Sequence, residues 1–261
     1  SVVGQGYEGV RYAVVDGGST DGSVGEIEAR AGGLFWWCSE PDGGQSQAIN
    51  KGFARVLAGD PGRGGVGEPE LGATDVMAWL NADDRLAPGA LAAVARVFRD
   101  EPDVDVVYGH RIVVDEEGRE VGRWVLPEHR ARSTVWGSYV PQETLFWRRR
   151  AWEAAGGRVD EGLRFAMDWD LFVRLEAATL AAGRRVVRIP LFLGVFTTHG
   201  DQKSVAIKEG VGRREFAEVR RRYAGRGLAR VACALRTYGL LARSVPAWWA
   251  AAARRRGQRG R

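Results

Sequence analysis

Short apolar blocks alternate with polar turns through the first half of the chain. The apolar runs at residues 12–15 and 34–38 are bounded by turn residues, as expected for buried strands. Residues 45–57 place Ala48, Ile49 and Phe53 at helical spacing on one face. Alternating strands and helices predict an α/β fold with a mainly parallel sheet and helices on both of its faces.

The same patterns divide the rest of the chain. Residues 58–74 are rich in Gly and Pro without periodicity, which predicts a flexible surface insertion. We expect a catalytic-type α/β domain at 1–223 and a basic helical tail at 224–261. The further elements predicted are strands at 76–80, 104–108, 143–147, 186–189 and 191–197, a hairpin at 112–125, and helices at 91–98, 168–182 and 203–222.

The net charge of +5 is unevenly distributed. Residues 211–261 contain 14 Arg and 2 Glu, a net charge of +12, so the remaining 210 residues carry −7. A signal for a basic, partner-binding segment therefore belongs to the tail and not to the body.

Composition narrows the protein class. Hydrophobic residues make up 45% of the chain, which predicts a packed core. No run approaches the ~18 apolar residues of a spanning helix, and the first residues do not resemble a signal peptide. Cys38 and Cys233 lie far apart and suggest neither a disulfide framework nor a zinc cluster. We expect a cytoplasmic protein, or one peripheral to the inner face of the cell membrane.

Acidic residues follow two of the predicted strands and begin one predicted helix. Asp16 and Asp83 end strands whose carboxyl ends share one sheet edge, where open α/β sheets bind ligands. Asp168 begins the predicted helix at 168–182, where it could be a helix cap or a general base.

Asp83 and Asp84 are expected to point in different directions, because neighbouring side chains leave a strand on opposite sides. One could hold a cation while the other braces the loop, and hard oxygen ligands suit Mg²⁺ or Mn²⁺. The alternative is a solvated turn in which Asp84 caps the next helix. His199 follows a predicted strand, and a single loop histidine is more often a surface residue than a ligand.

An ordered set of segments resembles family-2 glycosyltransferases, the inverting group with the GT-A fold. The resemblance covers about residues 1–205. Its segments are Val14-Val15-Asp16-Gly17-Gly18-Ser19-Thr20-Asp21-Gly22-Ser23, Glu40-Pro41-Asp42-Gly43-Gly44-Gln45-Ser46, Ala48-Ile49-Asn50-Lys51-Gly52, Trp79-Leu80-Asn81-Ala82-Asp83-Asp84, Met167-Asp168-Trp169-Asp170-Leu171 and the loop around His199.

The resemblance implies a GT-A (Rossmann-like) sheet with flanking helices and a role for each matching residue. Asp16 would bind the pyrimidine base of a nucleotide-sugar. Asp83 would bridge through Mn²⁺ or Mg²⁺ to the diphosphate, and His199 would complete the metal site or contact the diphosphate. Asp168 would be the base that takes the acceptor proton. The remaining residues of the donor site would be Gly18, Asp42, Gly44, Asn81 and Lys203.

Two positions and the start of the chain depart from the family pattern. Met167 stands where an acid often precedes the base. Asn81 replaces the usual first Asp of an Asp-x-Asp motif, which removes one charge near the metal. Residues 1–7 resemble the end of the family's first helix, so the first strand and most of that helix would be missing. We expect a sheet with an unpaired edge or a gap, and lower stability and activity than in an N-terminally extended chain.

The tail is amphipathic and basic. Its apolar row at helical spacing carries interspersed arginines, which suits an anionic membrane surface. The alternative is a helix packed on the domain. We expect no nucleic-acid partner, because the body is acidic. The residues of the row are Leu228, Val231, Leu235, Tyr238 and Ala242.

These expectations combine into one function. The chain would transfer a sugar, with inversion, from a nucleotide-diphosphate donor to a hydroxyl of a saccharide or lipid-linked saccharide. The main alternative is a catalytically silent nucleotide-sugar- or glycan-binding domain. A nicotinamide-dependent oxidoreductase is disfavoured, because Asp16-Gly17-Gly18-Ser19 stands where such enzymes carry Gly-x-Gly-x-x-Gly.

Overall fold

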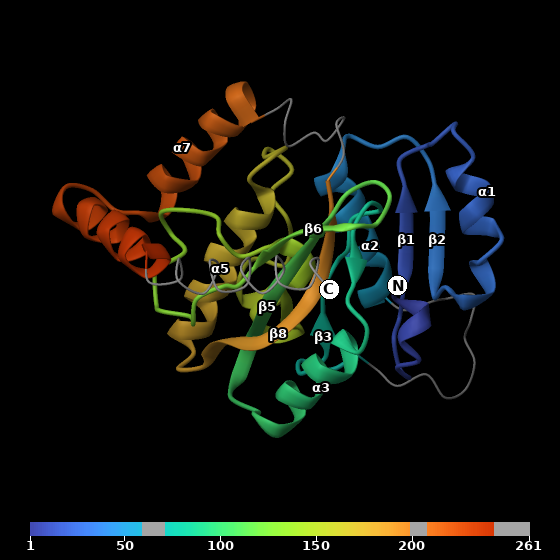
Figure 1. Ribbon diagram of the computed structural model, residues 1–261, viewed down its shortest axis with the longest axis horizontal. Helices are drawn as coiled ribbons and strands as arrows, with labels where there is room; N and C mark the ends of the chain where they lie inside the picture. The colour runs from blue at the N-terminus through green and yellow to red at the C-terminus, as the bar shows by residue number, and fades with distance from the viewer. Residues whose placement is uncertain (59–70, 199–207, 243–261) are drawn as a thin grey trace, which may run out of the picture.

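The computed structural model describes residues 1–58, 71–198 and 208–242 (Figure 1). A final helix spans residues 228–242 of this part. The other elements, in chain order, are η1 (Val3–Gln5), β1 (Ala13–Asp16), α1 (Ser23–Glu28), η2 (Ala31–Gly33), β2 (Trp36–Ser39), α2 (Gln45–Ala58), β3 (Val76–Met77), β4 (Arg85–Leu86), α3 (Ala90–Asp100), β5 (Val104–Val114), β6 (Glu120–Trp124), η3 (Gln142–Thr144), β7 (Phe146–Arg148), α4 (Arg149–Ala154), α5 (Met167–Ala181), β8 (Arg185–Thr197), η4 (Lys208–Gly212) and α7 (Arg213–Tyr223).

The strands form two hydrogen-bonded groups. β1 and β2 make a parallel pair, and the larger sheet has the order β3-β7-β5-β8-β4, with β6 paired to β5. Within the larger sheet only β5 and β8 are parallel, and the other pairs are antiparallel. The α/β class is confirmed, but the strand pairing is more mixed than expected. The tight turn between β5 and β6 is one reason, because so short a connection can join only antiparallel strands.

Most predicted elements are present, but several have other bounds. The strand expected at 143–147 covers only Phe146–Arg148, because residues Gln142–Thr144 form the 3-10 helix η3. The strands expected at 186–189 and 191–197 are one strand, β8. The strand expected at 76–80 covers only Val76–Met77, and the chain then forms a loop before β4. The helix expected at 203–222 is α-helical from Arg213, after a π-helical turn at Lys208–Gly212. The insertion expected at 58–74 falls mainly on residues 59–70, which lie outside the described residues.

A gap separates β1 from β3. Within the described residues, β1 pairs only with β2 and β3 pairs only with β7, so the edges that face each other have no strand partner. Figure 1 shows β1 and β2 standing apart from the larger sheet. A cleft of about 2380 Å³ is lined by both strands and continues to their carboxyl ends. This gap agrees with the unpaired edge expected from the sequence.

Helix α2 connects the two groups of strands. Gly52 lies so close to β1 that an added Cβ would be 3.3 Å from the Val15 side chain. Ile49 and Phe53 of the same helix pack against the core of the larger sheet. The position of β1 relative to β3 therefore depends on this helix.

The main core lies between the larger sheet and helices α4 and α5. Trp147, Trp152 and Leu171 are at most 2% exposed and belong to one cluster. A second cluster lies under α3, around Val94, Phe98 and strand β5. The expected helical tail is confirmed as far as residue 242. Within the described part of the chain, no helix is both long and apolar enough to cross a membrane.

Candidate functional site

Asp16 ends β1 and organises the turn that follows it. Its carboxylate accepts hydrogen bonds from the backbone N–H groups of Gly18 (3.0 Å) and Ser19 (2.9 Å). It also accepts from the hydroxyls of Ser19 (2.5 Å) and Ser39 (2.6 Å). These donors, the Ser19 and Ser39 hydroxyls first, lower the pKa of Asp16 to about 2. The carboxylate is therefore ionised and already fully hydrogen-bonded.

A second turn, before α2, lies against the first. The Asp42 carboxylate accepts from the N–H of Gly44 at 2.8 Å. A Cβ at Gly17 would lie 3.1 Å from that carboxylate, so the two turns are in close contact. Gly18 has φ +84° and Gly44 has φ +120°, which are conformations that favour glycine. Two glycine turns thus form one wall of the site at the carboxyl ends of β1 and β2.

The loop between β3 and β4 carries the predicted metal-binding segment. The Asn81 side chain accepts a hydrogen bond from Gln45 of α2 (2.6 Å) and donates one to Asp84 (3.2 Å). Asp83 is exposed, whereas Asp84 is 5% exposed. The expectation that the two carboxylates face different surroundings is confirmed. Helix α3 begins after Gly89, so Asp84 does not cap it.

Asp84 is buried among other charges. Burial, then the charges of Glu143 and Asp83, raise the pKa of Asp84 to about 7, against the opposing effect of Arg111. As a buried carboxyl that accepts a hydrogen bond from Asn81, Asp84 can stabilise the loop between β3 and β4. Both carboxylates line the cleft, and Asp83 is the exposed one.

Arg111 and Glu143 form a buried ion pair beside these residues. Two guanidinium nitrogens donate to the two carboxylate oxygens at 2.5 and 2.6 Å, and the side chains are 12% and 1% exposed. The guanidinium also lies 4.2 Å from the ring centre of Phe196. A Cβ at Gly194 would be 2.4 Å from the Glu143 side chain, so only glycine leaves room for it. Glu143 is therefore a buried partner of Arg111 and not a solvated residue.

Asp168 is the second residue of α5 and lines the cleft. Its carboxylate accepts from the N–H of Trp169 at 2.7 Å. Burial raises the pKa of Asp168 to about 6, although the Trp169 hydrogen bond and the Arg111 charge oppose that shift. The N-cap position is held by Ala166, so the interpretation of Asp168 as a helix cap is wrong. Its environment suits a base near neutral pH.

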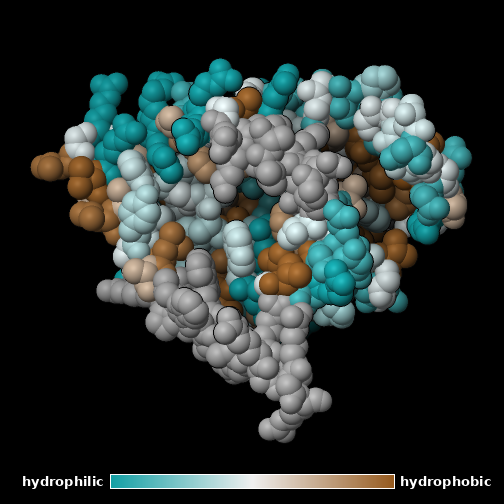
Figure 2. All heavy atoms as spheres, turned by 45° about the horizontal axis from the view of Figure 1, so that its top comes forward, coloured by the Kyte–Doolittle hydropathy of each residue, from teal (hydrophilic) through white to brown (hydrophobic). Residues whose placement is uncertain are grey.

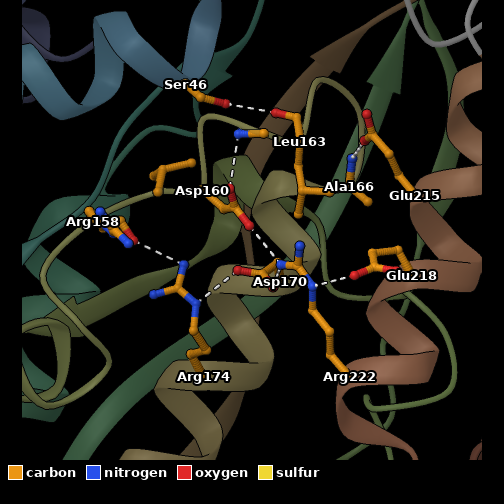
Figure 3. Close-up of polar contacts among 12 residues, drawn as sticks. Ser46, Arg158, Asp160, Leu163, Ala166, Asp170, Arg174, Glu215, Glu218 and Arg222 are labelled. Carbon is orange, nitrogen blue, oxygen red and sulfur yellow. Dashed lines mark hydrogen bonds and ion pairs between the residues drawn. The ribbon is translucent and has the colours of Figure 1, made fainter.

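Helix α7 holds the segment that leads into α5 (Figure 3). The buried Glu215 carboxylate accepts hydrogen bonds from three successive backbone N–H groups, those of Arg164, Phe165 and Ala166, at 2.8–2.9 Å. From the other side, the Ser46 hydroxyl of α2 donates to the carbonyl of Leu163 at 3.0 Å. The N-terminus of α5, and with it Asp168, is therefore fixed by two helices.

Asp170 is part of the same support and not of the cleft wall. It is 1% exposed and pairs with Arg174 at 2.8 Å and with Arg222 at 3.3 Å. It also accepts from the hydroxyl of Tyr223 at 2.8 Å. Figure 3 shows Arg174 and Arg222 approaching Asp170 from α5 and α7. Asp170 therefore has a structural role, since it links α5 to α7.

One cleft brings most of the predicted site together. Gly18 lies between two lining residues, Gly17 and Ser19. His199 and Lys203 lie outside the described residues. The predicted residues that line the cleft are Asp16, Asp42, Gly44, Asn81, Asp83 and Asp168. Within the described part, no three acidic, His or Cys side chains gather as a metal site.

Two features of the site were missed in the sequence. Arg111 lies inside a strand and no motif marks it. Its partner Glu143 packs against Gly194, and a glycine in an apolar strand is a signal that another segment approaches closely. Glu215 lies beyond the segments that carry the resemblance, in an Arg-rich stretch. Neither residue could be paired with its partner without the fold.

Comparison with known proteins identifies related sequences. The profile of the family described as "Glycosyl transferase family 2" matches residues 1–154. The O-antigen biosynthesis protein RfbC of Myxococcus xanthus is 29% identical over 187 residues, which cover 70% of this chain and 13% of that protein. An uncharacterized glycosyltransferase of Mycobacterium tuberculosis, MT1564, is 43% identical over 111 residues, 42% of this chain and 36% of that protein. The chain thus spans a minor part of both curated relatives.

Solved structures share the fold. S. aureus TarS 1–349 in complex with UDP-GlcNAc matches with a TM-score of 0.61 and 16% identity, over 93% of this chain and 66% of that one. The complex with UDP matches with a TM-score of 0.56 and 15% identity, over 93% and 65% of the two chains. The expected α/β fold of the GT-A type is thereby confirmed.

Proposed function

Because the chain belongs to glycosyltransferase family 2, we propose that it transfers a sugar from a nucleoside-diphosphate donor to a hydroxyl of a saccharide or lipid-linked saccharide. The observation that carries this proposal is the single cleft that Asp16, Asp83 and Asp168 reach from three separate segments. The UDP and UDP-GlcNAc complexes of TarS support a uridine nucleotide as the donor. The O-antigen relative supports polysaccharide synthesis as the setting.

In this proposal the two glycine turns bind the nucleotide. Gly18, Asp42 and Gly44 form the wall against which a ribose and a base would lie. The acceptor positions of Asp16 are filled by its own turn and by Ser39 of β2, so it can recognise a base only if the Ser19 or Ser39 hydroxyl turns away. Asn81 would contact the ribose or the phosphates, and Lys203 the phosphates.

A divalent cation, Mn²⁺ or Mg²⁺, fits the site only together with the substrate. Asp83 is an exposed, hard oxygen ligand, but the described residues offer no trio of ligands. Asp83 would therefore hold the ion with phosphate oxygens of the donor, and His199 would be a further ligand. When bound, the ion stabilises negative charge on the leaving diphosphate.

Asp168 is the proposed general base. It comes from α5, a later element than the loop of Asp83, and both side chains line the cleft. A carboxylate on the acceptor side removes the proton of the attacking hydroxyl while the diphosphate leaves on the other side. One such displacement inverts the configuration of the anomeric carbon.

A second candidate function is binding of a nucleotide-sugar without turnover. The unpaired edges of β1 and β3 favour it. No strand joins the β1–β2 pair, which carries the glycine turns, to the larger sheet within the described residues, and α2 packs against both. Catalysis requires a precise distance between the attacking hydroxyl and the donor, whereas binding of the donor does not.

Turnover separates the two candidates. We expect this chain with Mn²⁺ to release UDP from UDP-GlcNAc in the presence of a saccharide acceptor, and Asp168→Asn to bind UDP with unchanged affinity but without release. Asp170→Asn is unsuitable as a control because it is buried, so Asp100→Asn, an exposed residue of α3, serves instead. UDP binding by the unaltered chain without release of UDP from any of a panel of UDP-sugars would support the silent domain.

A further inference from the structure

The helix formed by residues 228–242 has one face fixed to the domain. Cys233, Thr237 and Leu240 are 4%, 1% and 6% exposed. The Thr237 hydroxyl donates to the carbonyl of Ser133 at 2.5 Å, and the Cys233 thiol lies 3.7 Å from the carbonyl of Arg132. The three inward residues follow a spacing of four and three, as one helix face requires.

The opposite face of this helix is apolar and exposed. Leu228, Val231, Leu235 and Tyr238 are 87%, 54%, 67% and 61% exposed. At about 100° per residue, these four side chains point away from the inward face. Figure 2 shows apolar side chains gathered at the left end of the molecule, where this helix lies in Figure 1. The apolar row seen in the sequence is therefore not the face that packs on the domain.

Basic residues lie between this apolar face and the domain. Arg230 and Arg236 are exposed on the two flanks of the helix, next to its domain-facing residues, where Arg230 lies 5.5 Å from the Trp136 ring and Arg236 donates to the carbonyl of Ala131. The supporting loop adds the exposed Arg130 and Arg132. Residues 224–261 contain nine Arg and no acidic residue. Long basic side chains can extend from such flanks while the apolar row is buried.

We propose that the exposed face of helix 228–242 inserts into the interface of a lipid bilayer rich in anionic headgroups. A bilayer of this kind can bury the apolar row in its hydrocarbon layer, and its headgroups supply negative charge for the nearby arginines. A second copy of the chain could bury the apolar row, but its own residues 224–261 include no acidic residue to pair with these arginines. The membrane contact is independent of the proposed sugar transfer.

The test is co-sedimentation of the whole chain with vesicles. One set is phosphatidylcholine alone, and the other contains about one third phosphatidylglycerol. We expect binding to the anionic set, weakened by salt, and little binding to the neutral set. Leu228→Ser with Leu235→Ser should lower the partition coefficient at least roughly tenfold. Arg230→Gln with Arg236→Gln should lower it roughly fivefold per arginine, and only on anionic vesicles.

The matched control is Leu180→Ser with Leu191→Ser, which removes two exposed leucines of α5 and β8. It should bind vesicles as the unaltered chain does, and all variants should keep the same circular dichroism and UDP affinity. Unchanged vesicle binding by Leu228→Ser with Leu235→Ser would overturn the proposal, since the remaining tail would then be the anchor. Light scattering that shows a dimer abolished by this pair, without vesicle binding, would also overturn it in favour of a second copy.

Discussion

Asp168 is the residue on which the proposed proton transfer depends. It lies in a partly buried position at the start of α5, and burial is the main reason why its pKa is about 6. A carboxylate with that pKa is a stronger base than an exposed one and is still ionised at neutral pH. Arg111 opposes the shift and so keeps the pKa from rising further.

We predict that kcat/KM for sugar transfer falls as the pH drops through about 6. Protonated Asp168 cannot accept the acceptor proton, so the rate should fall about tenfold per pH unit below that value. Arg111→Gln should move this acidic limb to higher pH, because a neighbouring positive charge that lowers the pKa of Asp168 is lost. The measurement is the pH dependence of kcat/KM from 5 to 8.5. A flat profile between pH 5 and pH 7 would exclude Asp168 as the base.

The Arg111–Glu143 pair makes a second prediction at this scale. Arg111→Met leaves the Glu143 carboxylate buried without its partner, which should lower the free energy of unfolding by about 3–5 kcal/mol. Replacing both residues by Met should cost less than Arg111→Met alone. Urea unfolding of the two single variants and the double variant measures the coupling. Additive losses would show that the ion pair does not couple the two residues.

Individual site residues could be predicted from the sequence where they stand in a local pattern. Asp16 and Asp83 each follow an apolar run, and Asp168 precedes an amphipathic one. Arg111 and Glu143 could not be found in this way, because their pairing spans 32 positions and depends on how η3 crosses β8 at Gly194. A long-range contact of this kind leaves no periodic signal.

At the scale of elements, α7 positions α5. Glu215 is 8% exposed and fills three backbone donors that precede the first turn of α5. A carboxylate at that end of a helix is also favoured by the helix dipole. The segment that carries Asp168 thus depends on an element more than forty residues later in the chain.

We predict that Glu215→Ala lowers kcat at least roughly tenfold and leaves the affinity for UDP unchanged, because a small displacement of the base weakens attack. Nucleotide-binding residues lie on other elements. Glu215→Gln, which keeps one acceptor oxygen, should restore part of the loss. Steady-state kinetics and calorimetric UDP titration measure the two quantities.

The matched control is Glu218→Gln, one turn later on α7, where the carboxylate pairs with Arg221 and Arg222 near the surface. It should leave kcat unchanged. Equal losses of kcat and UDP affinity in Glu215→Ala would indicate general damage to the fold and contradict the positioning role.

Element boundaries were harder to predict than element types. The apolar run at 76–80 reads as one strand, yet only Val76–Met77 has a partner, and the chain leaves the sheet to form the loop of Asn81. Neighbouring elements decide this, since the Gln142 side chain binds the carbonyl of Trp79 at 2.6 Å. Helix α5 was predictable to within one residue because its apolar positions recur strongly.

At the scale of the whole molecule, the split between the two groups of strands is the dominant feature. Two-stranded sheets are marginal by themselves in water. β1 and β2 rely on α2 and on their own pairing, whereas β5 lies inside the larger sheet with several residues fully buried. The nucleotide wall should therefore be the less stable half of the cleft.

We predict that backbone amides of β1 and β2 exchange with deuterium faster than those of β5 and β8. Val15 and Cys38 report on the first pair, and Val106 and Val107 on the core. Adding UDP with Mn²⁺ should slow exchange in β1 and β2 and leave the core unchanged, because the ligand binds the ordered form. Equal protection of both groups in the free protein would contradict a weakly held wall.

The gap itself was predicted from the resemblance, since periodicity within the chain carries no information on a neighbouring strand. The mixed direction of the larger sheet was not predicted. Alternation of strands and helices suggests parallel pairing, but β6 and β7 follow β5 without an intervening α-helix. The sequence also could not show which face of the tail helix packs on the domain, because both of its faces contain apolar residues.

The most direct test of the account is calorimetric binding of UDP, with and without Mn²⁺, to this chain, to Asp83→Ala and to the control Asp100→Ala. We predict Mn²⁺-dependent binding by the unaltered chain and the control, and its loss in Asp83→Ala. That result would establish a donor site in which Asp83 holds the cation. UDP binding of equal affinity in all three proteins, independent of Mn²⁺, would contradict the central claim.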